Sequence, residues 1–135
     1  MKLTEILNNL KVIQVAGSPE SVEIEKIVHD SREVEKNSLF VAIKGFQTDG
    51  HKFLQDVLSK KAAAVIIEDD SAVPDEMIKS ANAVKILVED SRRALAEVST
   101  TFFAQPSQKL DMVGITGTKG KTTTTYFLKS IFDHA

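Results

Sequence analysis

The sequence contains no cysteine among its 135 residues. The chain can therefore hold no disulfide framework, no thiolate metal site and no cysteine nucleophile. It also lacks any apolar run close to the ~20 residues of a membrane-spanning helix, and the N-terminal segment MKLTEILNNLKVIQ lacks the apolar core of a signal peptide. The formal net charge of -2 is too small to indicate a polyanionic partner. We therefore expect a cytoplasmic protein with neither a membrane nor a nucleic-acid partner.

The composition is that of a globular protein, with 42% apolar and 27% charged residues. Three apolar segments are predicted as buried strands: SLFVAI (38–43), AVIIE (64–68) and VKILVE (84–89). Apolar residues at helical spacing predict four helices: 3–10, one that begins near 50, 75–81 and 91–103. A half-buried strand is expected in VEIEKIVHD (22–30), where apolar and charged residues alternate over 22–25. Because strands that alternate with helices indicate parallel βαβ units, we expect residues 1–105 to form one α/β domain.

A second structural unit is expected after a polar linker, AQPSQ, at residues 104–108. A strand, DMVGIT, then leads through a glycine-rich loop into a helix that carries Tyr126, Phe127 and Ile131. One strand and one helix cannot close a core, since an α/β domain needs an open sheet covered on both faces. We therefore expect this chain to be the N-terminal portion of a longer protein, cut just inside its second domain.

The glycine-rich loop, GITGTKGKTTTT at residues 114–125, has the features of a phosphate-binding loop. The general pattern is G-x-x-x-x-G-K-[ST] between a strand and a helix, and it fails here by one residue, because Ile115 occupies the first glycine position. Gly117 and Gly120 nevertheless allow the backbone to turn its N–H groups toward a phosphate at a helix N-terminus. Lys121 would reach the β- and γ-phosphates and Thr122 would bind Mg²⁺. The alternative is a glycine-rich turn that begins an ordinary helix.

Two ordered motifs carry a resemblance to a known family. The segment GITGTKGKTTTT resembles the ATP loop of the Mur ligases, whose usual form is T-G-T-N-G-K-T-T. Residues 29–68 resemble the N-terminal domain of the MurE and MurF branches, with D-S-R, a strand LFVA, a glycine and D-G-H in that order. The resemblance covers most of residues 20–130, and GTKGKTT together with FQTDGHKF favours the MurE type.

This resemblance implies a domain organisation and two sets of site residues. Residues 1–105 would be the N-terminal domain that binds the UDP-N-acetylmuramoyl (UDP-MurNAc) substrate, and residues 106–135 the start of the ATP-binding domain: its first strand, P-loop and helix. The implied UDP-substrate contacts are His29, Ser31, Phe46, Gln47 and Thr48. The implied ATP contacts are Gly117, Thr118, Lys119, Gly120, Lys121, Thr122 and Thr123, with Lys121 as the catalytic residue and Thr122 as the Mg²⁺ ligand.

The implied activity is that of an ATP-dependent amide ligase of peptidoglycan precursor synthesis. It would add meso-diaminopimelate or L-lysine to UDP-N-acetylmuramoyl-L-alanyl-D-glutamate through an acyl phosphate, with ATP and Mg²⁺ as cofactors. We expect the full-length protein to be a monomeric enzyme, and the 135-residue chain alone to be inactive. Two alternatives stay open: a MurF-type ligase that adds D-alanyl-D-alanine, and a non-catalytic module that binds a nucleotide or UDP-sugar.

Several residues also have a structural interpretation. By itself, Asp30-Ser31-Arg32 is typical of a turn with an internal ion pair, and the second copy, Asp90-Ser91-Arg92, is expected to cap a helix. The histidines lack metal-ligand spacing and none is assigned to catalysis. Lys60 and Lys61 are expected only to end a helix, and the carboxylates at 68–70 only to form a solvated turn.

Overall fold

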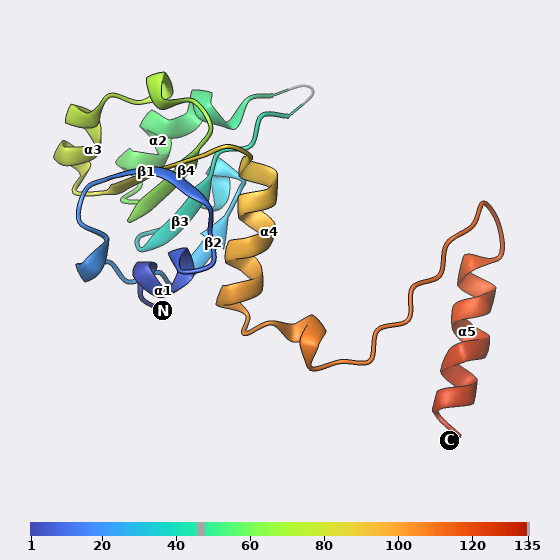
Figure 1. The fold of residues 1–135 in the computed structure, drawn as a ribbon. Helices are drawn as coiled ribbons and strands as arrows, with labels where there is room; N and C mark the ends of the chain where they lie inside the picture. The colour runs from blue at the N-terminus through green and yellow to red at the C-terminus, as the bar shows by residue number, and fades with distance from the viewer. Residues whose placement is uncertain (46–47, 135) are drawn as a thin grey trace. The chain divides into compact units, whose positions relative to one another are not determined.

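The computed structural model describes residues 1–45 and 48–134 of the chain. The chain divides into two compact units, Met1–Gln105 and Pro106–Ala135. In Figure 1 the first unit is the α/β body drawn from blue to orange, and the second contains the red helix α5 (Lys121–Phe132).

Within the described residues, five strands of the first unit form one sheet in the order β1-β5-β4-β3-β2. The strands are β1 (Val12–Ala16), β2 (Lys26–Val28), β3 (Ser38–Val41), β4 (Ala64–Ile67) and β5 (Val84–Val88). Strands β2 to β5 are parallel, whereas β1 pairs antiparallel with β5. The α-helices of this unit are α1 (Leu3–Leu7), α2 (Leu54–Ser59), α3 (Asp75–Ala81) and α4 (Ser91–Phe102). The predicted α/β class is confirmed.

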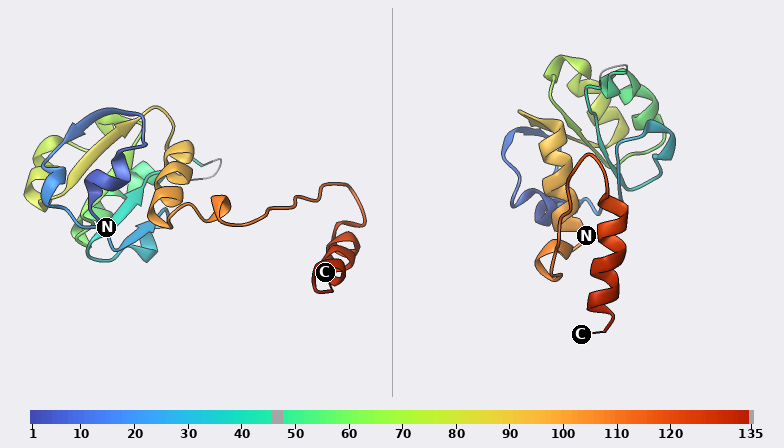
Figure 2. Two further views of the ribbon diagram at one scale, coloured as in Figure 1. Left: turned by 60° about the horizontal axis from the view of Figure 1, so that its bottom comes forward. Right: turned by 90° about the vertical axis from the view of Figure 1, so that its right-hand side faces the viewer.

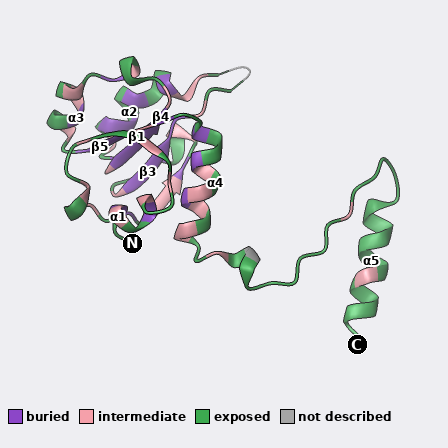
Figure 3. Ribbon diagram, viewed as in Figure 1, coloured by how far each residue is buried: buried purple, intermediate pink, exposed green. Residues whose placement is uncertain are grey.

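The sheet is buried on both faces, which gives the unit three layers (Figures 2 and 3). Successive side chains of β3 point to opposite faces of the sheet. Phe40 packs on the side of α2 and α3, whereas Leu39 and Val41 pack on the side of α1 and α4. The parallel strands are apolar at nearly every position because both of their faces are covered. Continuous apolar runs such as SLFV and AVII follow from this burial.

Four aspartates mark the carboxyl edge of the parallel strands. Each accepts a hydrogen bond from a backbone N–H two or three residues further along and begins the next helical turn. They are Asp30 before η2 (Ser31–Glu33), Asp49 before η3 (Gly50–Phe53), Asp69 before η4 (Asp70–Ala72) and Asp90 before α4. The expected helix cap at the second D-S-R copy is therefore confirmed, with Asp90 as the capping residue.

Two strands differ from the sequence-based expectation. β1 was not predicted. It is an edge strand whose three central residues are exposed, so its sequence shows no regular alternation of apolar and polar residues. The strand expected in VEIEKIVHD (22–30) forms only over its central residues, as β2, and Glu23 forms only an isolated bridge with Lys2. In both cases the backbone partner, rather than the local apolar pattern, decides where the strand lies.

A buried lysine lies within β5. Lys85 has 2% of its surface exposed, and its ammonium pairs with Asp70 at 2.7 Å and with Asp75. Burial lowers the pKa of Lys85, but its hydrogen bonds to the two carboxylates outweigh that effect and the pKa is raised. The same contact lowers the pKa of Asp75. Asp69 and Asp70 lie on an exposed turn, as expected, but Asp70 also neutralises a buried cation, a role that the sequence analysis did not assign to it.

The second unit contains η5 (Pro106–Gln108), an extended segment and α5. The strand predicted over residues 111–116 is not formed, because no neighbouring strand in this unit offers backbone hydrogen-bond partners. The apolar side chains of α5 stay exposed, among them Tyr126, Phe127, Ile131 and Phe132. The predicted helix after the loop is confirmed.

In the Lys85 cluster, removal of the two carboxylates should destabilise the protein more than removal of the lysine. Asp70→Asn together with Asp75→Asn leaves a buried ammonium unpaired and should lower Tm by roughly 5–10 °C. Lys85→Met should lower Tm less, because water can solvate the two half-exposed carboxylates that remain. Thermal unfolding followed by circular dichroism measures both values. A larger loss in Lys85→Met than in the double variant would contradict this account.

The same cluster predicts a pH dependence. Because the folded chain holds the pKa of Asp75 below its usual value, the contribution of this ion pair is present at neutral pH. It begins to be lost as the pH falls below about 4, where the aspartate of the unfolded chain takes up its proton, and is gone once the pH is below the lowered pKa of the folded chain. The Tm difference between the wild type and the Asp70→Asn/Asp75→Asn variant should therefore shrink in that range.

Candidate functional site

A cleft of about 660 Å³ opens at the carboxyl edge of the parallel strands. Its wall is formed by the residues that follow β2, the loop after β3 and the first two turns of α4. Polar lining residues include His29, Ser31, Arg32, Thr48 and Arg92. Ligands of open parallel sheets bind outside the carboxyl ends of the strands, so this is the position where a ligand is expected.

Three of the five predicted UDP-substrate residues meet in this cleft. His29 and Ser31 directly follow β2, whereas Thr48 comes from the loop after β3. The hydroxyl of Ser31 makes no hydrogen bond to any described residue, so it is available to a ligand. The other two predicted contacts, Phe46 and Gln47, lie outside the described residues.

The first D-S-R segment forms a short turn at the mouth of this cleft. The carboxylate of Asp30 accepts hydrogen bonds from the Arg32 backbone at 2.9 Å and from the Arg32 guanidinium at 2.5–3.1 Å. The guanidinium contact holds the pKa of Asp30 well below its usual value. The structural interpretation of this tripeptide, a turn with an internal ion pair, is therefore confirmed. This turn also places Ser31 at the cleft.

Lys60, which the sequence analysis regarded only as a helix end, is tied to the same turn. Its ammonium donates to the backbone carbonyl of Ser31 at 2.8 Å and pairs with Asp56 at 2.8 Å. It thereby joins the end of α2 to the D-S-R turn. No sequence pattern could have found this contact, because the two residues lie 29 positions apart.

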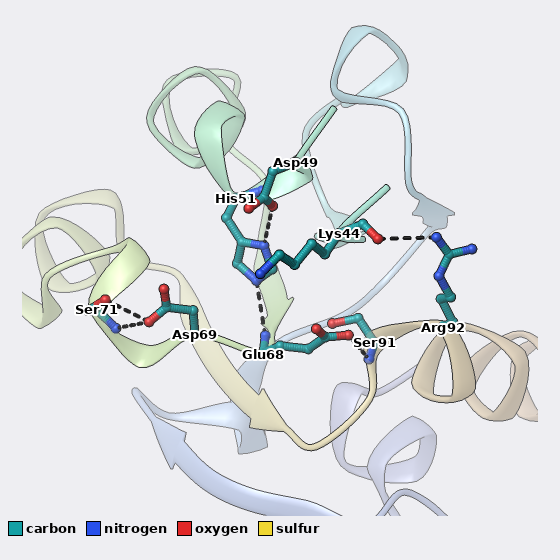
Figure 4. Close-up of polar contacts among 8 residues, drawn as sticks. All are labelled: Lys44, Asp49, His51, Glu68, Asp69, Ser71, Ser91 and Arg92. Carbon is teal, nitrogen blue, oxygen red and sulfur yellow. Dashed lines mark hydrogen bonds and ion pairs between the residues drawn. The ribbon is translucent and has the colours of Figure 1, made fainter. Parts of the chain in front are cut away.

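The buried imidazole of His51 joins the loop after β3 to the end of β4 (Figure 4). Its Nε2 atom accepts a hydrogen bond from the backbone N–H of Glu68 at 3.0 Å. A nitrogen that accepts cannot carry the proton, so the neutral ring is protonated at Nδ1 and donates to Asp49 at 2.7 Å. The two hydrogen bonds from His51 lower the pKa of Asp49. His51 is therefore a buried residue with both ring nitrogens hydrogen-bonded.

These contacts continue to α4 and back to the loop. The carboxylate of Glu68 accepts from the backbone N–H of Ser91 at 2.7 Å, at the first residue of α4. The next residue, Arg92, donates from Nη2 to the Lys44 carbonyl at 3.1 Å. Lys44 in turn forms an antiparallel backbone bridge with Asp49, which closes the circuit of contacts. Sequence reasoning missed Arg92, although the second D-S-R copy was a visible signal.

The glycine of the D-G-H segment is required by close packing. A Cβ atom on Gly50 would lie 2.8 Å from the Ile43 backbone nitrogen and 3.2 Å from the Ala42 Cα atom. Any other residue would push the loop away from the end of β3. The glycine therefore lets the chain after Thr48 return to the sheet beside the cleft.

The predicted ATP-binding residues all lie in the second unit, in the loop before α5 and in its first turn. Gly117 and Gly120 have φ values of 151° and 78°, in a region that favours glycine. The Lys121 ammonium donates to the Gly117 carbonyl at 2.7 Å and so spans the loop. Thr118, Lys119, Thr122 and Thr123 are exposed. The first N–H groups of α5 have no intrahelical acceptor, which suits an anion.

Residues 1–45 and 48–134 contain neither a candidate metal cluster nor a helix that could span a membrane. No group of three or more histidine, aspartate or glutamate side chains there is placed to hold a metal ion. No helix in that part of the chain is both long and apolar enough to cross a bilayer. Thr122, the Mg²⁺ ligand that the family resemblance implies, would supply a single hydroxyl, and the ion would need other oxygen ligands, such as those of a nucleotide.

Comparisons with known proteins give the following matches. Residues 23–103 match the family described as "Mur ligase family, catalytic domain". The chain is 40% identical over 134 residues to the UDP-N-acetylmuramoyl-L-alanyl-D-glutamate–2,6-diaminopimelate ligase of Alkaliphilus metalliredigens. It is 42% identical over 135 residues to the ligase of the same name from Clostridium tetani. These matches cover 99% and 100% of the chain but 26% and 27% of the relatives, so the chain spans about a quarter of their length.

Solved structures give a related result. A UDP-N-acetylmuramoylalanyl-D-glutamyl-2,6-diaminopimelate–D-alanyl-D-alanyl ligase from Acinetobacter baumannii matches with a TM-score of 0.68 and 26% identity, over 98% of this chain and 28% of its own. The MurF ligase of Thermotoga maritima in complex with ADP matches with a TM-score of 0.54 and 31% identity, over 77% of this chain and 22% of its own.

The hydrogen bonds of His51 predict that it stabilises the first unit. His51→Ala should lower the free energy of unfolding by about 2–4 kcal/mol, because it leaves the Glu68 N–H and the Asp49 carboxylate without this partner and opens a small cavity. The exposed His29 provides the control, and His29→Ala should change it by less than about 0.5 kcal/mol. Urea denaturation measures both. Equal midpoints for the two variants would show that the buried contacts contribute little.

Proposed function

The chain belongs to the Mur ligase family, and we propose that it forms the substrate-binding N-terminal part of an ATP-dependent ligase of peptidoglycan precursor synthesis in the cytoplasm. The observation that carries this proposal is the meeting of His29, Ser31 and Thr48 in one cleft. These residues come from different loops, and nothing in the packing of the core requires them to share a cleft. The family resemblance assigns all three to the UDP end of a substrate.

The substrate we propose is UDP-N-acetylmuramoyl-L-alanyl-D-glutamate, and the added amino acid is meso-diaminopimelate. The relatives that are about 40% identical are named for this reaction, which favours diaminopimelate over lysine. In the cleft, the Ser31 hydroxyl and the Thr48 side chain would donate to the nucleotide part, beside His29. Phe46 and Gln47 complete the proposed set.

We propose a monomer, with residues 1–105 as the UDP-MurNAc-binding domain and residues 106–135 as the start of the ATP-binding domain.

We further propose that the loop before α5 binds ATP. The backbone N–H groups of Gly120, Lys121 and Thr122 would hold phosphate oxygens, and the Lys121 ammonium would move from the Gly117 carbonyl to the β- and γ-phosphates. Mg²⁺, held by the Thr122 hydroxyl and the nucleotide, would neutralise developing charge. Thr118, Lys119 and Thr123 complete the proposed loop. The ADP complex of the Thermotoga maritima MurF ligase supports nucleotide use in this family.

The proposed reaction has two steps. The γ-phosphoryl group of ATP passes to the free side-chain carboxylate of the D-glutamyl residue, which releases ADP. The amino group of the incoming amino acid then attacks the acyl phosphate, loses a proton and displaces phosphate as the amide bond forms. Phosphoryl transfer depends mainly on positioning and charge neutralisation, and both Lys121 and the loop amides can provide these.

A second candidate is a MurF-type ligase that adds D-alanyl-D-alanine. The solved structures that resemble this chain include MurF ligases from Acinetobacter baumannii and Thermotoga maritima. Assays of the full-length protein with diaminopimelate, lysine and D-alanyl-D-alanine separate the candidates. Turnover only with the dipeptide would favour the MurF type. Binding of a UDP-sugar without turnover with any acceptor would favour a non-catalytic module.

From its position in the cleft, Ser31 should affect the binding of the UDP substrate but not that of ATP. In the full-length protein, Ser31→Ala should raise the Michaelis constant for the UDP substrate about fivefold, the effect of one lost neutral hydrogen bond of about 1 kcal/mol. The Michaelis constant for ATP should not change. Ser59 lies outside the cleft and bonds the Asp56 carbonyl, so Ser59→Ala is the matched control. A change in the ATP constant alone would contradict the assignment of Ser31.

The loop predicts that Lys121 is essential for turnover. Lys121→Ala should lower kcat by at least about a hundredfold, because a cation on the transferred phosphate stabilises the transition state by several kcal/mol. Lys129 lies on the same helix and pairs with Asp133, so Lys129→Ala should keep most of its activity. Steady-state assays of the two full-length variants test this. Near-normal turnover in Lys121→Ala would rule out the phosphate-loop assignment.

A further inference from the structure

Arg92 and its neighbour Arg93 differ in whether their guanidinium groups pair with a carboxylate. Arg93 pairs with Glu97 one turn further along α4, at 2.7 Å. Arg92 lines the cleft and has no carboxylate partner among the described residues; its guanidinium instead bonds a neutral group, the Lys44 carbonyl. A guanidinium has five N–H donors, and this contact uses one of its nitrogen atoms. The remaining donors are available to another acceptor.

The charged side chains among the described lining residues give the cleft a net positive charge. Asp30 and Arg32 neutralise each other through their hydrogen-bonded ion pair, and the lowered pKa of Asp30 keeps its carboxylate ionised. Arg92 then contributes a positive charge that no other described lining residue balances. A cleft with this balance favours an anionic group near Arg92, because opposite charges attract most strongly where no other partner screens them.

The position of Arg92 is also held from two sides. The Glu68 carboxylate holds the backbone N–H of Ser91, which fixes the start of α4. The Lys44 carbonyl holds Nη2 of the guanidinium, as Figure 4 shows. A side chain restrained in this way loses less entropy when it binds a ligand. Its planar group suits the paired oxygens of a phosphate.

We propose that Arg92 binds a phosphate group of the nucleoside diphosphate, beside Ser31 and Thr48. This assignment rests on the proposed function, since it takes the cleft to be the site for the UDP end of the substrate. The phosphates would lie toward the first turn of α4. A purely structural role, in which Arg92 only holds the loop through Lys44, is the competing explanation.

The test compares ligands with and without phosphate. Isothermal calorimetry of the 135-residue chain with UDP and with uridine should show tighter binding of UDP. Arg92→Gln should weaken UDP binding about tenfold, the lower end for one charge-assisted hydrogen bond, and leave uridine binding unchanged. Arg92→Lys should keep part of the UDP affinity, because it retains the charge but loses the planar fork. Arg93→Gln, the matched control, should bind both ligands as the wild type does.

Two results would overturn the assignment of Arg92 while leaving the proposed function intact. One is an unchanged affinity of Arg92→Gln for UDP. The other is a loss of UDP and uridine affinity by the same factor, which shows that Arg92 only holds the loop. By contrast, the absence of UDP binding in both the wild type and Arg93→Gln would overturn the proposed function of the cleft itself.

Discussion

The buried imidazole of His51 holds together the segments that form the cleft. It donates to Asp49 in the loop after β3 and accepts from the backbone of Glu68 at the end of β4. Because Glu68 in turn binds the first residue of α4, three segments from separate parts of the chain are linked through one side chain and its partner. Each hydrogen bond satisfies a polar group that would otherwise be costly to bury. The shape of the cleft therefore depends on a residue that does not line it.

The two D-S-R copies show how similar local chemistry can serve different roles. In both, the aspartate caps a helical turn at the carboxyl edge of the sheet. In the first copy, the arginine folds back on its own aspartate and the serine reaches the cleft. In the second, the serine is buried and the arginine reaches the cleft. The difference arises because the first copy continues as a short 3₁₀ turn, whereas the second begins a twelve-residue helix.

Much of the fold could be predicted from local pattern, because a strand covered on both faces must be apolar at nearly every position. SLFV, AVII and VKILV met this condition, and their order along the chain implied parallel pairing. The strand expected at 111–116 carried a similar apolar signal and is not formed, since a strand also needs backbone partners. β1 shows the converse: its central residues are exposed, and its pairing with β5 alone makes it a strand.

For the cleft, the sequence alone determined which loops follow the parallel strands, and the motif resemblance then selected His29, Ser31 and Thr48. Those loops must lie at one edge, because parallel strands all end on the same side of a sheet. The tertiary structure decided which distant residues join them. Lys60 reaches the Ser31 carbonyl across 29 positions, and Arg92 reaches the Lys44 carbonyl across 48. Such contacts depend on the direction of a side chain in the packed molecule, which residue order does not specify.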